Sequence, residues 1–295
     1  MRSKKILIGL LALLLIAVLA AGCGKKKKSQ PSTTGKTGGS SITAPSRIAS
    51  AGKLVFCSDI TYPPEEFYEG TKPVGSDIEV GAELAKRMGV KAEFNNTGFD
   101  AIIAALLAKK CDVIVSGMND TPERAKQVDF VDYMSVGQSF MVKKGNPAKV
   151  TGIPSLSGKK ASVEVGTTNK DFLDAESKKL TAQGKKAIIV IPFPKDTDAA
   201  NALKTGRVDA YFGDAPVVAY YVAQNPDSFT FGGQPVNPIP VGMAIRKEDK
   251  ELSAAIAKGV KAMYDDGTMK KILDKWKMGD TALKPDVVAK LVRRR

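Results

Sequence analysis

The sequence predicts an α/β protein with two lobes, and three patterns lead to this prediction. Short β-branched apolar runs such as Val113-Ile114-Val115 are typical of buried parallel strands. Strands of this kind alternate with amphipathic helices in two successive units. Two extended segments then bracket the second unit, as expected for a domain inserted into another. The two units are alike in architecture, without a residue-level repeat.

The first unit is predicted to run strand, helix, strand, helix, strand. These elements are expected at residues 53–57, 78–88, 90–94, 100–109 and 113–115, and Gly89 ends the first helix. The second unit repeats this order at residues 160–165, 169–183, 187–191, 198–205 and 208–212. Two further helices are predicted at 250–264 and 269–276.

The bracketing extended segments are residues 135–143 and 240–246. Two strands that join an inserted domain to its host form a double hinge. The sequence therefore predicts two lobes that close on a ligand in the cleft between their strand ends.

The amino terminus resembles a bacterial lipoprotein signal. Basic residues precede the apolar stretch 6–21, and small residues precede Cys23. Residues 1–22 are accordingly expected to be a signal peptide, with Cys23 as the lipid-bearing residue. Residues 23–46 are rich in Lys, Ser, Thr and Gly and predict a flexible tether. An uncleaved membrane anchor is the alternative interpretation.

The charge of the chain is concentrated at its ends. The net charge is +14, but residues 1–50 carry nine Lys/Arg without an acidic residue, and Arg293–Arg295 add three more. The remaining residues 51–292 therefore carry only +2, which argues against nucleic-acid binding. The terminal arginines are expected to be a solvated tail.

The sequence contains no histidine, which excludes serine–histidine catalysis and histidine metal sites. Cys57 lies near the end of one predicted strand and Cys111 lies at the start of another. If these strands are parallel, the two thiols lie at opposite ends of the sheet and cannot form a disulfide. Both are expected to be small buried apolar residues.

The segment VIVSGMNDTPERAKQVDF suggests a site for a carboxylate. Thr121-Pro122 is typical of a helix N-cap followed by proline at the first helical position. Arg124 could hold a carboxylate through two parallel bonds, with Ser116, Gly117 and Asn119 supplying polar contacts from the preceding turn. A solvated helix arginine is the alternative.

Six stretches between Lys53 and about Lys277 together resemble the amino-acid-binding (family 3) solute-binding proteins of bacterial ABC importers. They are SDITYPPEEF, VGSDIEVGAELAKRMGV, GFDAIIAALLAKKCDVIVSGMNDTPERAKQVDF, VEVGTTNKDF, GRVDAYFGD and DDGTMKKILDKW. The resemblance implies a type II periplasmic-binding-protein-like fold, with lobe 1 formed by residues 47–140 and 241–295 and lobe 2 by residues 141–240.

The family also implies a function without catalysis, cofactor or bound metal. The expected protein is an extracytoplasmic monomer, anchored to the membrane through Cys23, that delivers a free amino acid to a membrane permease and its ATPase.

The resemblance implies roles for individual residues. Tyr62 and Phe99 would sandwich the ligand, and Arg124 would pair with its α-carboxylate, helped by Gly117, Asn119 and Thr168. Asp214 would hold the α-ammonium group. A ligand bridged between Arg124 and Asp214 has both charges compensated only when the lobes close.

The ligand's side chain would face acids. Asp59 and Glu164 stand at positions that line this end of the site in the family, and Glu66 is close in sequence to the rim. These acids favour a cationic amino acid such as arginine, lysine or ornithine, while a neutral polar ligand such as glutamine or histidine stays open. So does a cyclohexadienyl dehydratase-like enzyme with Glu164 as general acid, although Asp214 argues against it.

Overall fold

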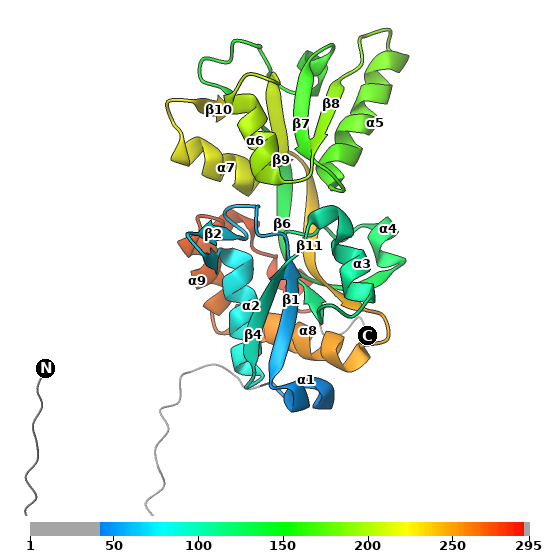
Figure 1. Cartoon of the computed structure of the whole chain (residues 1–295), viewed down its shortest axis with the longest axis vertical. Helices are drawn as coiled ribbons and strands as arrows, with labels where there is room; N and C mark the ends of the chain where they lie inside the picture. Colours follow the sequence, from blue (N-terminus) through cyan, green and yellow to red (C-terminus); the bar gives the residue numbers. More distant parts are fainter. Residues whose placement is uncertain (1–41, 292–295) are drawn as a thin grey trace, which may run out of the picture. The chain divides into compact units, whose positions relative to one another are not determined.

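The computed structural model describes residues 42–291 and contains two α/β lobes joined by two long strands (Figure 1). The strands are β1 Lys53–Ser58, β2 Phe67–Glu69, β3 Lys72–Val74, β4 Lys91–Asn96, β5 Val113–Ile114, β6 Val128–Lys143, β7 Lys160–Glu164, β8 Ile189–Phe193, β9 Ala210–Asp214, β10 Phe229–Phe231 and β11 Val236–Arg246. The α-helices are α1 Ser46–Ala51, α2 Ser76–Arg87, α3 Ile102–Leu107, α4 Pro122–Ala125, α5 Thr168–Ala182, α6 Asp196–Lys204, α7 Ala215–Gln224, α8 Lys250–Asp265, α9 Thr268–Lys275 and α10 Pro285–Val288. The predicted two-lobed α/β class is confirmed.

One sheet runs through both lobes in the order β4-β1-β5-β11-β6-β9-β7-β8. The first lobe contains the parallel trio β4-β1-β5, and the second contains the parallel trio β9-β7-β8. Between them β6 and β11 run antiparallel to each other and pass from one lobe to the other (Figure 1). Because parallel strands begin and end at the same edge, the carboxyl ends of both trios face the crevice between the lobes.

The strand β6 is longer than the predicted segment 135–143 because it serves both lobes. Its residues from Val128 to Val136, and again Gln138, pair with β11, while Gln138 to Met141 pair with β9 on the other side. The ladder between β6 and β11 is irregular between Val236 and Ile239 and between Val241 and Gly242, near the passage between lobes. Such irregularities bend a strand locally and weaken the ladder, which fits a hinge.

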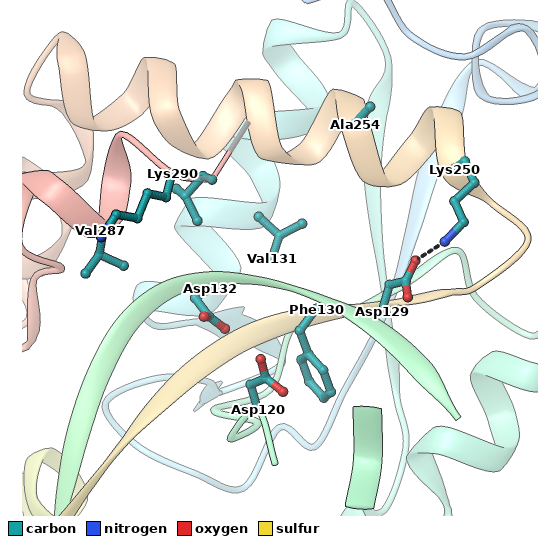
Figure 2. A pocket seen from close by; sticks show the side chains of 10 residues that line it. Asp120, Asp129, Phe130, Val131, Asp132, Lys250, Ala254, Val287 and Lys290 are labelled. Carbon is teal, nitrogen blue, oxygen red and sulfur yellow. Dashed lines mark hydrogen bonds and ion pairs between the residues drawn. The ribbon is translucent and has the colours of Figure 1, made fainter. Parts of the chain in front are cut away.

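The core of the first lobe forms where α2 and α8 pack on the sheet. Leu84 and Val260 are fully buried in it together with Phe56. A Cβ atom at Gly259 would lie 2.3 Å from Cδ2 of Leu84, so this glycine allows α8 to approach α2 closely. At the start of α8, Lys250 pairs with Asp129 of β6 at 2.7 Å (Figure 2).

The predicted elements are all present, with ends shifted by a few residues, but several short elements were not predicted. The hairpin β2–β3 has strands of only three residues, too short to show a period. The helix α7 is apolar almost throughout, so it has no polar face from which a helical period could be recognised.

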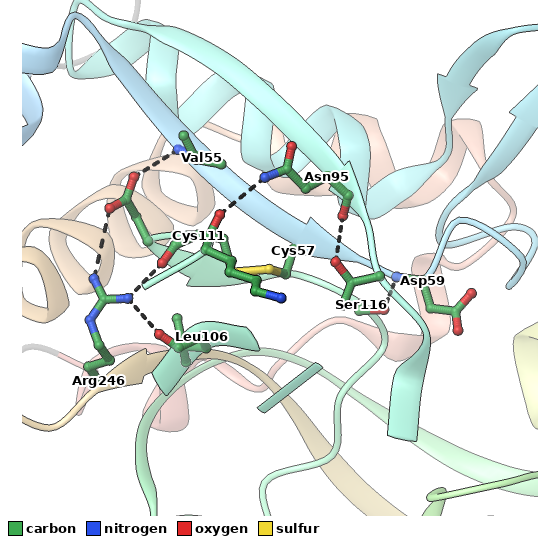
Figure 3. Close-up of a disulfide and its surroundings, with 11 residues drawn as sticks. Val55, Cys57, Asp59, Asn95, Leu106, Cys111, Ser116 and Arg246 are labelled. Atoms are coloured by element: carbon green, nitrogen blue, oxygen red, sulfur yellow. Dashed lines mark hydrogen bonds and ion pairs between the residues drawn. A yellow bond between two sulfur atoms is a disulfide. The ribbon is translucent and has the colours of Figure 1, made fainter. Parts of the chain in front are cut away.

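The expectation that Cys57 and Cys111 cannot meet is wrong, because they form a disulfide with a Cα–Cα distance of 5.6 Å (Figure 3). The two strands are parallel, but β5 has only two residues, and its Ile114 pairs with Cys57. The start of β5 therefore lies beside the end of β1. Arg246 holds the approaching chain by donating to the carbonyl oxygens of Leu106 and Cys111 at 2.9 and 2.6 Å. Both cysteines are buried, as predicted.

Parts of the chain's ends lie outside the described residues. These are the predicted signal peptide 1–22, Cys23, the tether up to residue 41 and the arginine tail. The end of the predicted tether is described and is packed, since the N–H of Ile42 donates to the carbonyl oxygen of Arg87 at 2.9 Å and its side chain lies against the first lobe's core. Within residues 42–291 no helix is long and apolar enough to cross a membrane.

The disulfide generates a stability prediction. Replacing Cys57 and Cys111 together by serine should lower the free energy of unfolding by about 4 kcal/mol, because the closed loop of more than fifty residues restricts the unfolded chain. Urea titrations of the two proteins measure the difference. As a check on the bond itself, thiol titration of a Cys23→Ser protein unfolded without reductant should detect no free thiol, and two free thiols would refute it.

Candidate functional site

The predicted site residues gather at the crevice between the lobes. A small cavity there is lined from both sides, by Asp59, Tyr62, Glu66, Phe99, Gly117 and Asn119 of the first lobe and by Glu164, Thr167, Thr168, Asn169 and Asp214 of the second. Eight of the ten predicted ligand-binding residues are in this set. The cavity has a volume of only ≈ 10 Å³, which is about the space of one water molecule. The lobes are therefore closed onto each other's side chains.

Asp59 is held in one orientation at the end of β1. Its N–H donates to Oγ of Ser116, and its carboxylate accepts from Oγ1 of Thr61 and from the N–H of Phe99, each at 2.8 Å. Ser116 does not line the cavity. Its hydroxyl instead donates to Glu66 at 2.7 Å, so it links the backbone N–H of Asp59 to the carboxyl group of Glu66.

Tyr62 spans the crevice. Its ring packs in a cluster of second-lobe residues that includes Tyr211, and its hydroxyl accepts from the N–H of Asp214 at 3.2 Å. The ring also lies against Gly117, where a Cβ atom would be 3.3 Å from it and where φ is +49°. Glycine therefore leaves room for the ring and adopts the left-handed backbone without strain.

Arg124 lies beside the cavity rather than in its wall. The predicted cap is confirmed, since Thr121 precedes α4 and its side chain accepts from the N–H of Arg124 at 3.2 Å. The guanidinium donates to the carbonyl oxygens of Asn119 and of Gly166 on the other lobe, both at 3.0 Å. It also stacks over the Phe99 ring at 5.3 Å. Arg124 thus bridges the lobes through carbonyl groups in this closed arrangement.

The start of α5 supplies polar groups from the second lobe. The side chain of Thr168 donates to Oδ1 of Asn119 across the crevice. Asn169, which the sequence reasoning missed, donates to Oδ1 of Asp214 at 3.2 Å. Its position directly after Thr168, in the first turn of a helix that follows a strand, was the available signal.

Carboxyl groups dominate the electrostatics of the site. Asp59, Glu66, Glu164 and Asp214 line the cavity, and Glu65, Asp77 and Asp196 lie behind them. Each of these seven side chains is at most 4 % exposed. Opposing positive charge comes from Arg124, which acts on Asp214, and from Lys195, which acts on Asp59.

Burial raises the pKa values of these carboxyl groups. The pKa of Asp214 rises to about 6, although hydrogen bonds from Asn169 and Tyr62 and the charge of Arg124 oppose the rise. The pKa of Asp77 also rises to about 6. For Glu164 burial raises the pKa well above its usual value, and the charges of Asp196 and Asp59 add to this effect. A side-chain hydrogen bond to Asp59 adds to the rise in the pKa of Glu164, and the same bond opposes the rise in the pKa of Asp59.

Asp196 supports this acidic surface from behind. Its two carboxylate oxygens accept from the hydroxyls of Tyr211 and Tyr221, and burial raises its pKa to about 7. By contrast, Oε1 of Glu164 and Oε2 of Glu66 have no hydrogen-bond partner among residues 42–291. Buried acceptors without donors are costly, and a cation rich in N–H groups would satisfy them.

The site combines an arginine with several buried carboxyl groups. Among the described residues no group of acidic or cysteine side chains is arranged to hold a metal ion. An arginine on one side and buried carboxylates on the other match the two charges of an amino acid zwitterion.

Comparison with known proteins gives one consistent family. A model of bacterial extracellular solute-binding proteins, family 3, matches residues 54–279. The chain is 30% identical over 233 residues to the ABC transporter arginine-binding protein 1 of Escherichia coli, covering 77% of this chain and 92% of that protein. It is 31% identical over 232 residues to the histidine-binding periplasmic protein of Salmonella typhimurium, with coverage of 76% and 87%.

Solved structures agree with these matches. An ancestral arginine-binding protein bound to arginine has a TM-score of 0.70 and 40% identity, covering 76% of this chain and 98% of that one. An ancestral amino acid-binding protein described as a precursor of cyclohexadienyl dehydratase has a TM-score of 0.71 and 35% identity, with coverage of 78% and 97%.

The raised pKa values predict an unusual pH dependence. The carboxyl groups of Asp77, Asp196 and Asp214 bind protons more tightly in the folded protein than in the unfolded chain. Protonation of these groups therefore stabilises the fold, fully below about pH 4, and this stabilisation is lost as the pH rises through about 6 to 7. The melting temperature of the ligand-free protein should therefore fall between pH 5 and pH 7.5. Calorimetry measures it, and Asp196→Asn should flatten the fall.

The control for this prediction is Asp198→Asn, which removes an exposed carboxylate from the same helix. It should leave the slope unchanged. A melting temperature that rises with pH in all three proteins would contradict the assignment.

Proposed function

The chain belongs to the bacterial extracellular solute-binding proteins of family 3, and we propose that it captures a free cationic amino acid for an ABC importer. The ligand would be of the arginine, lysine or ornithine type. The observation that carries this proposal is the concentration of seven buried carboxyl groups around one crevice. Such a site costs free energy without protons or a cation, and a cationic ligand supplies the compensating charge.

The ends of the ligand would be held by the two lobes. Its α-carboxylate would replace a carbonyl partner of Arg124, whose guanidinium donates to the carbonyl oxygen of Asn119. The side chain of Asn119 in turn accepts from Thr168. Its α-ammonium group would bind Asp214, which Asn169 and Tyr62 already orient. The aromatic rings of Tyr62 and Phe99 would enclose the aliphatic part.

The cationic end of the ligand would lie between Asp59 and Glu164, which come from different lobes. A hydrogen bond between these two carboxyl groups, which contributes to both pKa shifts, requires a proton on one of them. A guanidinium or ammonium group placed between them removes the need for that proton and joins the lobes by charge. Ligand binding would therefore stabilise the closed state, which is the requirement for a trap.

Entry of the ligand requires the lobes to separate, since the closed cavity is too small for an amino acid. We assign this motion to β6 and β11, the two strands that pass between the lobes. The lobes that move would be residues 47–140 with 241–295, and residues 141–240.

The relatives support an amino acid as the ligand, but they differ in which amino acid they are named for. Their names specify arginine, cystine and histidine, and one ancestral arginine-binding protein was solved with glutamine bound. The buried acids favour a cation among these. Membrane attachment through Cys23, after removal of residues 1–22, and delivery to a permease with its ATPase complete the proposal.

A second candidate is a dehydratase on the same fold. Two observations favour it: the likeness to a precursor of cyclohexadienyl dehydratase, and the raised pKa of Glu164, which would keep a proton available for a general acid. Asp214 favours a binding protein over the enzyme, because its carboxyl group would pair with an α-ammonium group, which prephenate lacks.

A ligand screen tests the proposed function. The protein should be unfolded and refolded to remove bound ligand, and its melting temperature then measured with each amino acid and with prephenate. Ligand that binds only the folded state raises the melting temperature, so arginine, lysine or ornithine should produce the largest shifts. A shift with neutral amino acids alone would refute the cationic preference, and conversion of prephenate would establish the enzyme.

Glu164→Gln tests the recognition of the ligand's charge. The affinity for arginine should fall by about 1.5–3 kcal/mol, the scale of a hydrogen bond to a charged group. The affinity for citrulline, which has the same shape without the charge, should change much less. Isothermal titration calorimetry measures both affinities.

Glu176→Gln is the matched control, because Glu176 lies outside the crevice and pairs with Lys179 on α5. It should leave both affinities unchanged. An equal loss for arginine and citrulline in Glu164→Gln would show that Glu164 does not recognise the cation.

A further inference from the structure

A second contact between the lobes lies outside the ligand crevice and is made by aromatic rings. Phe67 of β2 in the first lobe packs against Tyr220 of α7 in the second, with ring centroids 5.4 Å apart and planes inclined by 56°. Phe67 also meets the ring of Trp276, at the end of α9, edge-to-face at 5.7 Å. The three elements lie on the same side of the molecule (Figure 1). We call these three rings the aromatic seam.

The aromatic seam is separate from the ligand crevice. Its rings line a cavity of ≈ 260 Å³ together with other residues of β2, α7 and α9. No described residue lines both this cavity and the crevice. The ring contact therefore joins the lobes without touching a ligand in the crevice.

The rings are fixed within their own lobes. In the first lobe, the indole N–H of Trp276 donates to Oε1 of Glu79 at 3.2 Å. In the second lobe, Tyr220 meets Tyr221 edge-to-face at 6.1 Å, and the hydroxyl of Tyr221 donates to Asp196 at 2.9 Å. Separation of the lobes therefore breaks the contact across the seam instead of carrying one ring along with the other.

We propose that the aromatic seam stabilises the closed lobes with or without a ligand, through the contact of Phe67 with Tyr220. An aromatic pair of this geometry changes an equilibrium constant by about 3- to 10-fold beyond the burial of its surface. The contact exists in the closed arrangement and is lost on opening, so it shifts the balance between the two by that factor. The proposal rests on the hinge motion of the proposed function, but not on which amino acid the crevice binds.

The seam and the crevice would then have different tasks. The acids of the crevice distinguish one ligand from another, because they contact it. The seam adds the same stabilisation of the closed lobes for every ligand, and so sets how long any of them is retained. Phe67 and Tyr220 are positioning residues in this scheme.

A double-mutant cycle in the ligand-free protein gives the first test. After unfolding and refolding to remove ligand, Tyr220→Ala should lower the melting temperature by about 2–4 °C, the shift expected from losing a contact of this size. It should have little effect in the Phe67→Ala background, because the partner ring is already gone.

The matched control for the cycle is Tyr68→Ala. Tyr68 is the next residue of the same strand, and its side chain is exposed. The effects of Tyr68→Ala and Tyr220→Ala should add. Additive effects of Phe67→Ala and Tyr220→Ala would overturn the proposal.

The rate of ligand release gives the second test, since release requires the lobes to open. Labelled arginine, glutamine and histidine, each in turn, are chased with an excess of the unlabelled amino acid. Tyr220→Ala should release each probe that the native protein retains about 3- to 10-fold faster, by the same factor for each. Tyr68→Ala should leave the rates unchanged.

An unchanged release rate in Tyr220→Ala, or a change confined to one probe, would overturn the proposal. A native protein that retains none of the three probes would contradict the proposed function instead. The cycle in the ligand-free protein would still decide whether the seam stabilises the closed lobes.

Discussion

The withdrawal of seven carboxyl groups from water around one crevice is the constraint on which the rest of this structure depends. Ionised carboxylates are stable there only with protons, hydrogen-bond donors or opposite charge. The fold provides donors to some of them, as at Asp59 from Thr61 and Phe99, and at Asp196 from two tyrosines. Oxygens without a donor among the described residues remain at Glu65 and Asp77 behind the cavity, and at Glu164 and Glu66 in its wall, where a ligand could reach them.

Because the carboxyl groups come from both lobes, their burial affects how readily the lobes open and close at the hinge. Asp59 and Glu164 belong to different lobes, and among the described strands β6 and β11 alone carry the sheet from one lobe to the other. Contacts across the crevice include the hydrogen bonds of Tyr62 with Asp214, Arg124 with Gly166 and Thr168 with Asn119. Rings of the first lobe also pack on the second lobe, as Phe67 does against Tyr220. The balance between open and closed lobes is therefore sensitive to any charge placed between the acids.

Much of the site was predictable because its residues follow strands. The carboxyl ends of parallel strands meet at one edge, which brings Asp59 near Ser116 in one lobe and Glu164 near Asp214 in the other. The family resemblance supplied the roles of Asp59, Glu164 and Asp214. The contributions of Glu65, Asp77, Asp196 and Asn169 were not predicted. These residues act from behind or beside the cavity, and their burial follows from how hairpin β2–β3 and helices α5 and α6 pack.

The sequence by itself determined the alternation of strands and helices and the two extended segments of the hinge, because these depend on the local periodicity of apolar residues. It also determined that Thr121 caps the helix that carries Arg124, because an N-cap depends on the residue types within one turn. Only the tertiary structure decided that Cys57 meets Cys111, that Ser116 links Asp59 to Glu66, and that Tyr62 reaches the second lobe. These contacts depend on strand register and on the approach of the two lobes. Both are set by the packing of segments far apart in the chain, which no local pattern records.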